Sequence, residues 1–121
     1  MQTIRFEKTG GPVRVDVRSG WANPGAYELI IWAANSNKKV KQMAGNFLNA
    51  DDDRYDLPGL AAVQDGRIVE AFVSIAPLSE DGRYFASLLF SQDGRILADV
   101  SFGGTTKEHT VTLDLFARLE A

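Results

Sequence analysis

The densest cluster of side chains that could bind a metal ion lies near the middle of the chain. Asp51, Asp52 and Asp53 are consecutive, Asn49 precedes them, and Asp56 follows. Ca²⁺ takes oxygen ligands of these types, so Asp51, Asp53 and Asp56 are the candidate ligands for the only cofactor that the sequence suggests. The spacing lacks the turn glycine and the final glutamate of an EF-hand loop. A solvated acidic loop, or a helix cap at Asp53, is therefore the alternative.

Catalytic motifs are sparse in this sequence. Nucleophilic catalysis needs a base beside a nucleophile and a third group that orients the base. The single histidine, His109, lies beside Glu108 at the start of a predicted strand, and the chain has no cysteine and no Gly-x-Ser-x-Gly sequence. A glycosidase would need two carboxylates at a defined separation, which a sequence cannot locate. We expect no enzymatic activity and keep a small hydrolase as the distant alternative.

Several aromatic residues could stack against the apolar face of a sugar ring. The candidate set comprises Trp21, Asn23, Tyr27, Trp32 and Tyr55. Trp21 is the most informative, because it lies in a predicted loop, where core packing explains an aromatic side chain less readily. A tryptophan that closes one end of a β-sandwich is the competing interpretation. A carbohydrate ligand is therefore an alternative that the sequence keeps open.

Length, composition and charge limit the function classes. The chain has 121 residues, enough for a single domain over residues 1–121 with a core of its own. Thirteen basic and sixteen acidic residues give a net charge of −3, whereas nucleic-acid-binding proteins usually carry a basic stripe. No segment approaches the ~18 apolar residues of a membrane span, and the amino terminus lacks a hydrophobic signal core. We expect a soluble, cytoplasmic protein that binds neither nucleic acid nor membranes, or an extracellular one if a signal has been removed.

Alternation of apolar and polar residues, which is typical of half-buried β-strands, dominates the chain. Val13, Val15 and Val17, for example, alternate with charged residues. We expect eight or nine strands, no helix, and an all-β fold: an antiparallel two-sheet β-sandwich of immunoglobulin-like or jelly-roll style, with a small up-and-down β-barrel as the alternative. The predicted core comprises Val13, Val15, Val17, Leu29, Ile31, Val73, Ile75, Leu88, Phe90, Val111, Leu113 and Leu115.

Three copies of Asp-Gly-Arg, at 65–67, 81–83 and 93–95, mark reversals of the chain. Asp-Gly favours the type I′ turn of a β-hairpin, because both central residues of that turn need a positive φ. The sequence therefore predicts that residues 60–102 form an antiparallel meander, which begins with a strand at 60–64.

Three segments without regular alternation are expected to form ligand-facing loops, since sandwiches present function on the loops between strands. They are residues 19–25, 45–59 and 103–108. The longest of them, 45–59, could contain one helical turn near residues 47–50.

Several predicted strands are apolar on both sides. If one side of each strand fills the core, the other side points outward, and contiguous outward apolar patches usually mark an interface or a ligand groove. The outward set comprises Ile30, Trp32, Phe72, Phe85, Leu89 and Phe116. In the alternative interpretation these residues belong to different sheets or are covered by another part of the chain.

These patterns together predict a non-catalytic binding or assembly module that forms a homo-oligomer through an apolar sheet face. The alternatives are a Ca²⁺-dependent or carbohydrate-binding β-sandwich with a protein or carbohydrate ligand. The candidate ligand- or partner-binding residues are Trp21, Asn23, Trp32, Tyr55, Phe85 and Leu89.

Overall fold

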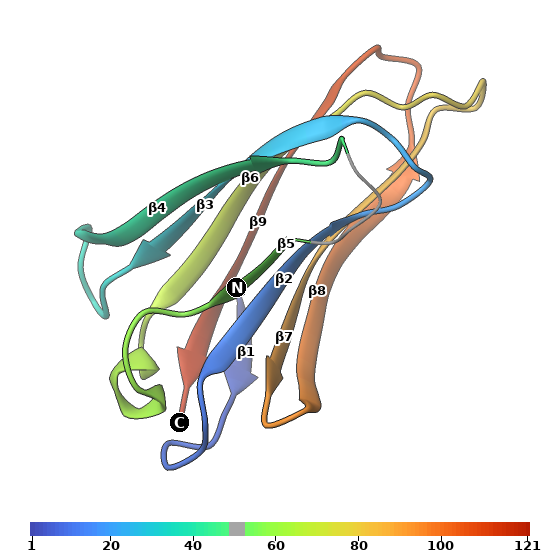
Figure 1. The fold of residues 1–121 in the computed structure, drawn as a ribbon. Coiled ribbons are helices and arrows are strands. Elements are labelled where there is room, and N and C mark those ends of the chain that lie inside the picture. The colour runs from blue at the N-terminus through green and yellow to red at the C-terminus, as the bar shows by residue number, and fades with distance from the viewer. Residues whose placement is uncertain (49–52) are drawn as a thin grey trace.

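Two β-sheets pack face to face in the computed structural model of the protein, which describes residues 1–48 and 53–121 (Figure 1). The five-stranded sheet has the order β1 (Gln2–Arg5), β9 (Val111–Glu120), β6 (Ile68–Ile75), β3 (Gly25–Trp32) and β4 (Lys39–Asn46). The four-stranded sheet has the order β5 (Asp53–Asp56), β2 (Val13–Ser19), β7 (Arg83–Gln92) and β8 (Arg95–Thr105). All pairings are antiparallel except that of β1 with β9. The predicted all-β, mostly antiparallel two-sheet sandwich is confirmed.

The core lies between the sheets and is built from alternate residues of each strand. In β6, for example, Val69, Ala71, Val73 and Ile75 are fully buried while the intervening residues are not. Ten of the twelve predicted core residues are buried, and the exceptions, Val111 and Leu113, are half-buried. Both lie in the first half of β9. On the side of β9 away from β6, β1 pairs with residues 117–120 only, so no described strand pairs with the first half on that side.

The predicted meander over residues 60–102 is wrong. Of the three Asp-Gly turns, only Asp93-Gly94 closes a hairpin, between β7 and β8, with positive φ at both residues. Gly82 instead lies in the connection from β6 in one sheet to β7 in the other. The predicted strand at 60–64 is a 3₁₀ helix (Ala61–Gln64). Asp-Gly specifies a sharp reversal, but it does not specify which sheet the next strand joins.

The predicted loop 45–59 contains two strand segments, the end of β4 and all of β5. The sequence of β5, Asp-Arg-Tyr-Asp, shows no apolar alternation because this strand lies at a sheet edge, where charged residues are common. Phe47 and Leu48 are not helical, and the rest of the proposed helical turn lies outside the described residues.

Two glycines in positive-φ turns allow a matched test of this topology. A Cβ at Gly82 would collide with the Thr106 carbonyl oxygen, whereas a Cβ at Gly94 would meet nothing within 4 Å. Gly94→Ala should therefore cost only the backbone strain, about 1 kcal/mol of unfolding free energy. Gly82→Ala should add a steric clash and cost about 3 kcal/mol. Urea denaturation measures both, and equal losses would contradict the close approach of the two connecting loops.

Candidate functional site

Two of the predicted ligand-binding residues lie at the end of the sandwich where β2 turns into β3. Trp21 is exposed, has a positive φ, and lies with its ring centroid 5.1 Å from the Arg83 guanidinium carbon. Asn23 is buried: its side-chain amide donates to the Arg83 carbonyl oxygen at 2.8 Å, and its Oδ1 accepts from the Leu78 N–H at 3.0 Å. Asn23 therefore joins two connecting loops and is not available to a ligand.

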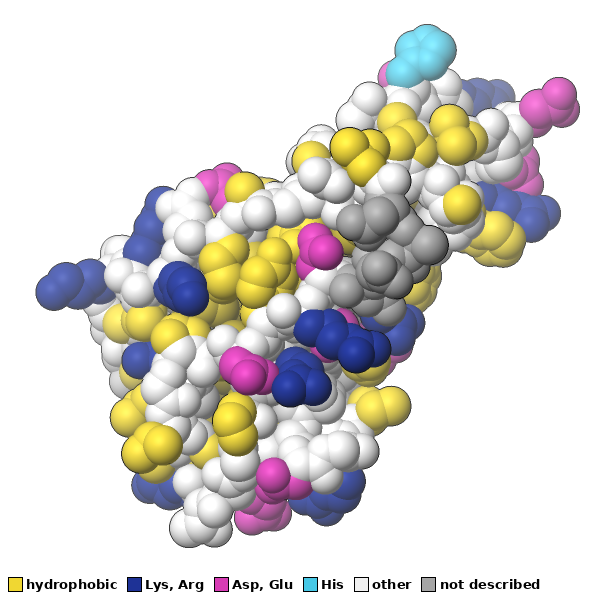
Figure 2. All heavy atoms as spheres, in the orientation of Figure 1, with side chains coloured by type: hydrophobic (Ala, Val, Ile, Leu, Met, Phe, Trp, Pro, Cys, Tyr) yellow, Lys and Arg dark blue, Asp and Glu magenta, His cyan; other side chains and the backbone are white. Residues whose placement is uncertain are grey.

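Tyr55 belongs to a hydrogen-bonded group at the margin of the sandwich formed by the edge strands β4 and β5. The Tyr27 hydroxyl contacts the Tyr55 hydroxyl and donates to the Asp53 carboxylate at 2.5 Å. Burial and the Asp53 hydrogen bond raise the pKa of Tyr27. Figure 2 shows hydrophobic side chains gathered along this margin, where the half-buried Phe47 also packs against Tyr27.

The two predicted Ca²⁺ ligands that the structure describes, Asp53 and Asp56, do not come together. The Asp53 carboxylate is bound by Tyr27, while Asp56 projects from the other face of β5 and forms an ion pair with Arg14 at 3.1 Å. Alternate side chains of a strand point to opposite faces, so these two residues cannot share one ion. Asp51 lies outside the described residues. Within residues 1–48 and 53–121 no group of three His, Asp or Glu side chains is arranged to hold a metal ion.

The predicted six-residue apolar face is split between the two sheets. Ile30, Trp32, Phe72 and Phe116 lie on the outer side of the five-stranded sheet. Phe85 and Leu89 lie on β7, in the other sheet, and therefore face the opposite side of the molecule. The prediction of one patch is wrong. Period-two alternation shows which face of its own strand a side chain lies on, but it does not show which sheet that strand joins.

Leu89 has charged neighbours on the outer side of the four-stranded sheet. Its cross-strand partners are Asp16 on β2 and Asp99 on β8. Asp16 forms an ion pair with Arg54 at 3.2 Å, and Asp99 pairs with Arg18 at 3.8 Å. This side of the molecule is therefore largely covered by ion pairs.

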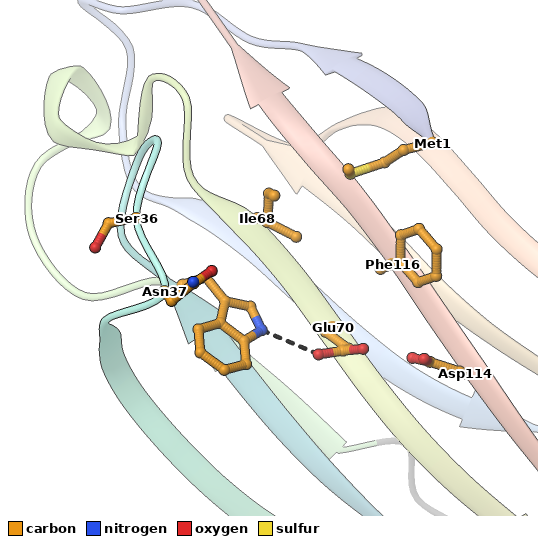
Figure 3. Close-up of a pocket in the computed structure, with 8 residues that line it drawn as sticks. Met1, Ser36, Asn37, Ile68, Glu70, Asp114 and Phe116 are labelled. Carbon is orange, nitrogen blue, oxygen red and sulfur yellow. Dashed lines mark hydrogen bonds between the residues drawn. The ribbon is translucent and has the colours of Figure 1, made fainter.

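The outer side of the five-stranded sheet contains a shallow hollow of about 500 Å³. Its lining comprises Met1, Trp32, Ser36, Asn37, Ile68, Glu70, Asp114 and Phe116. In Figure 3 the Asp114 side chain points toward Glu70, and the Phe116 ring lies on the same side of Glu70 as Asp114. The dashed line marks the hydrogen bond that Glu70 accepts from the Trp32 indole. The hollow thus combines two aromatic rings with two adjacent carboxyl groups.

Strand register brings the two carboxyl groups together. Glu70 on β6 lies opposite Phe116 on β9, and Asp114 lies opposite Phe72, so Glu70 and Asp114 are diagonal neighbours on one face. The Trp32 indole N–H donates to Glu70 Oε1 at 3.0 Å and fixes the position of that carboxylate. Partial burial, together with the hydrogen bond and negative charge of Glu70, raises the pKa of Asp114 to about 6.

Neither carboxyl group has a cationic partner among the described residues. The five ion pairs of the described chain involve other carboxylates. Lys39 Nζ lies 5.8 Å from the centroid of the Trp32 ring and donates to Gln42. Two neighbouring carboxyl groups without a counterion among the described residues repel each other, which is unfavourable for stability.

The side chains that bear on catalysis are the carboxyl pair and the single histidine. Glycosidases separate their two carboxyl groups by at least about 5 Å, so that a substrate atom or water lies between them. Glu70 and Asp114 are diagonal neighbours on adjacent strands, and the negative charge of Glu70 contributes to the raised pKa of Asp114. His109 lies in the connection between β8 and β9, which projects beyond the body of the sandwich at the far end of the molecule (Figures 1 and 2). What the hollow can do chemically is accept hydrogen bonds from a donor that carries positive charge.

Sequence reasoning identified Trp32 and Phe116 as outward-facing, but it missed the pairing of Glu70 with Asp114. Alternation in 68–75 and 111–118 already places both carboxyl groups on the minority face of their strands. Their adjacency depends on the β6–β9 pairing and its register, which bring together two residues more than forty positions apart in the sequence. No local pattern carries that information.

Comparison with known proteins finds no match for the chain among protein-family models, curated proteins or solved structures. Within the part of the chain that the structure describes, no helix is both long and apolar enough to span a membrane.

Removing the charge of Asp114 should stabilise the fold. At pH 7.5, Asp114→Asn relieves the repulsion with Glu70 and should add about 1 kcal/mol to the unfolding free energy, after allowance for solvent screening at this exposed position. The gain should shrink as the pH falls from 6 to 4, because in that window folded Asp114 retains a proton that the unfolded chain has lost.

Glu28→Gln is the matched control, because Glu28 lies on the same face, opposite Phe72. Urea denaturation at several pH values measures both variants. A loss of stability in Asp114→Asn at pH 7.5 would contradict the repulsive carboxyl pair.

Proposed function

We propose that the protein is a non-catalytic binding module whose ligand is a small organic cation with an alkylammonium group, held in the hollow on the five-stranded sheet. The observation that carries the proposal is the pair of carboxyl groups, Glu70 and Asp114, that lack a counterion between two aromatic rings. An ammonium group supplies three hydrogen-bond donors and a positive charge. It would satisfy both carboxylates at once and convert their repulsion into attraction.

The aromatic rings support the same class of ligand. A cation within about 6 Å of an indole or phenyl face is attracted by the ring quadrupole, and Trp provides the strongest such site. Lys39 already lies near that distance from Trp32, which indicates that the ring attracts positive charge. The methylene groups of an alkylammonium ion would contact Ile68 and Phe116, which border the carboxylates in the hollow.

The carboxyl pair makes this binding dependent on pH. Charged groups around Asp114 are Glu70 on β6, Glu28 on β3, and Arg118 farther along β9 on the same face. A proton on Asp114 competes with the ligand for the same negative charge. Because the pKa of Asp114 is about 6, affinity for the cation should fall about tenfold between pH 7 and pH 5.

The test uses the two indole N–H signals of the protein in proton–nitrogen NMR. Trp21→Phe identifies the Trp32 signal, which reports directly on the N–H that Glu70 accepts. Titration with butylammonium at pH 7.5 should shift the Trp32 signal, and Asp114→Asn should weaken that response at least tenfold. Glu28→Gln should leave it within about twofold of the wild-type response.

Methyl glucoside is the probe for the carbohydrate alternative. A Trp32 shift with this neutral sugar and none with butylammonium would overturn the proposed ligand class in favour of a sugar. The absence of any Trp32 response to butylammonium up to 100-fold molar excess per site, on the order of 10 mM, would also overturn it.

A further inference from the structure

The four-stranded sheet ends in an open edge at β8. This strand pairs with β7 on one side only and has no strand on its other side. Its register with β7 is continuous from Ala98 to Thr105, and the single irregularity lies nearer the β7–β8 turn. The backbone N–H and C=O groups on the outer side of this regular segment pair with no other described strand, so a strand of another molecule could pair with them.

The other three edge strands carry features that prevent such pairing. β1 and β5 have four residues each, and three of the four residues of β5 are charged. β4 carries Lys39 and Lys41. Short length and lysine side chains are the common means by which native sheets avoid edge-to-edge association.

β8 has none of these features. It has eleven residues, and from Ile96 to Thr105 its only charged residue is Asp99. It contains no proline, and Gly103 and Gly104 permit the close approach of another backbone. Phe102 is 53% exposed and stacks on Tyr84 at a centroid distance of 6.3 Å. A long, regular edge with a single charged residue between Ile96 and Thr105 and an exposed aromatic residue is suited to strand pairing.

We propose that β8 pairs antiparallel with β8 of a second copy of the chain, so that the two four-stranded sheets form one continuous sheet across a twofold axis. Residues directly opposite each other in an antiparallel pair lie on the same face, so the twofold axis must lie midway between one residue and the same residue of the second copy. An axis at Ser101 places Val100 opposite Phe102 on the inner face, an apolar cross-strand pair. It places Asp99 opposite Gly103 on the outer face, whereas an axis at Asp99 would oppose two carboxylates.

The second copy is the occupant that this edge fits best. The segment pairs with itself with no like charges directly opposed, and it covers the exposed Phe102 of both copies. The hollow with Glu70 and Asp114 lies on the other sheet and stays accessible in such a dimer.

The first half of β9 also has an edge with which no other described strand pairs. Pairing of β8 with that edge would be head-to-tail and would produce open chains of molecules in place of a closed dimer.

Charge substitution at Ser101 tests both the partner and the register. Ser101 is exposed on the outer face, and in the proposed dimer it lies opposite Ser101 of the second copy. Ser101→Lys and Ser101→Asp should each raise the dimer dissociation constant at least tenfold, since like charges then face each other. An equimolar mixture of the two variants should restore the dimer, because the opposed residues become a lysine and an aspartate.

Light scattering after size-exclusion chromatography, over a dilution series, measures the mass, and circular dichroism verifies that each variant is folded. Gln42→Lys on the β4 edge is the control and should leave the wild-type mass unchanged. A monomeric wild-type protein at ~100 µM would overturn the proposal, as would a concentration-dependent series of larger species. A dimer that survives in both single variants, or a mixture that does not recover, would exclude pairing through β8 centred on Ser101.

Discussion

The burial of one face of each strand between two sheets is the constraint on which the rest of this structure depends. Because a strand alternates its side chains with a period of two, burying Val69, Ala71, Val73 and Ile75 commits Glu70 and Phe72 to the opposite face. A shift of one residue in any pairing would expose the whole inner set, so the register is strongly determined. The core therefore fixes the positions of the outward side chains as firmly as its own.

The carboxyl pair is a consequence of that rigid arrangement. Glu70 and Asp114 are diagonal neighbours because β6 and β9 pair in the register that buries their inner faces. The indole N–H of Trp32 then holds one carboxylate in place. A protein under selection for stability alone would place an opposite charge at one of these positions, as it does at Asp16 and Arg54 on the other sheet. The contrast between the two outer sides is the physical basis of the proposed binding site in the hollow.

Sequence alternation was enough to predict the fold class and most of the core, because both depend on local periodicity. The same reasoning failed for features that depend on which strands pair with each other and which sheet each strand joins. Phe85 and Trp32 were assigned to one patch, yet β7 and β3 belong to different sheets. Asp81-Gly82 was predicted to close a hairpin, although it connects the two sheets. Asp53 was proposed as a metal ligand, and its carboxylate is bound by Tyr27, a residue 26 positions away.

The protonation of Asp114 is the property on which the central claim depends. Carbon-13 NMR of the side-chain carboxyl groups, recorded from pH 3 to pH 9, measures its pKa directly in the folded protein. A value near 6 that falls when an alkylammonium ion is added is the result that the account predicts, since the cation replaces the proton as the counterion of the pair. A value near 4, as in a free aspartate, and unchanged by the cation would contradict it.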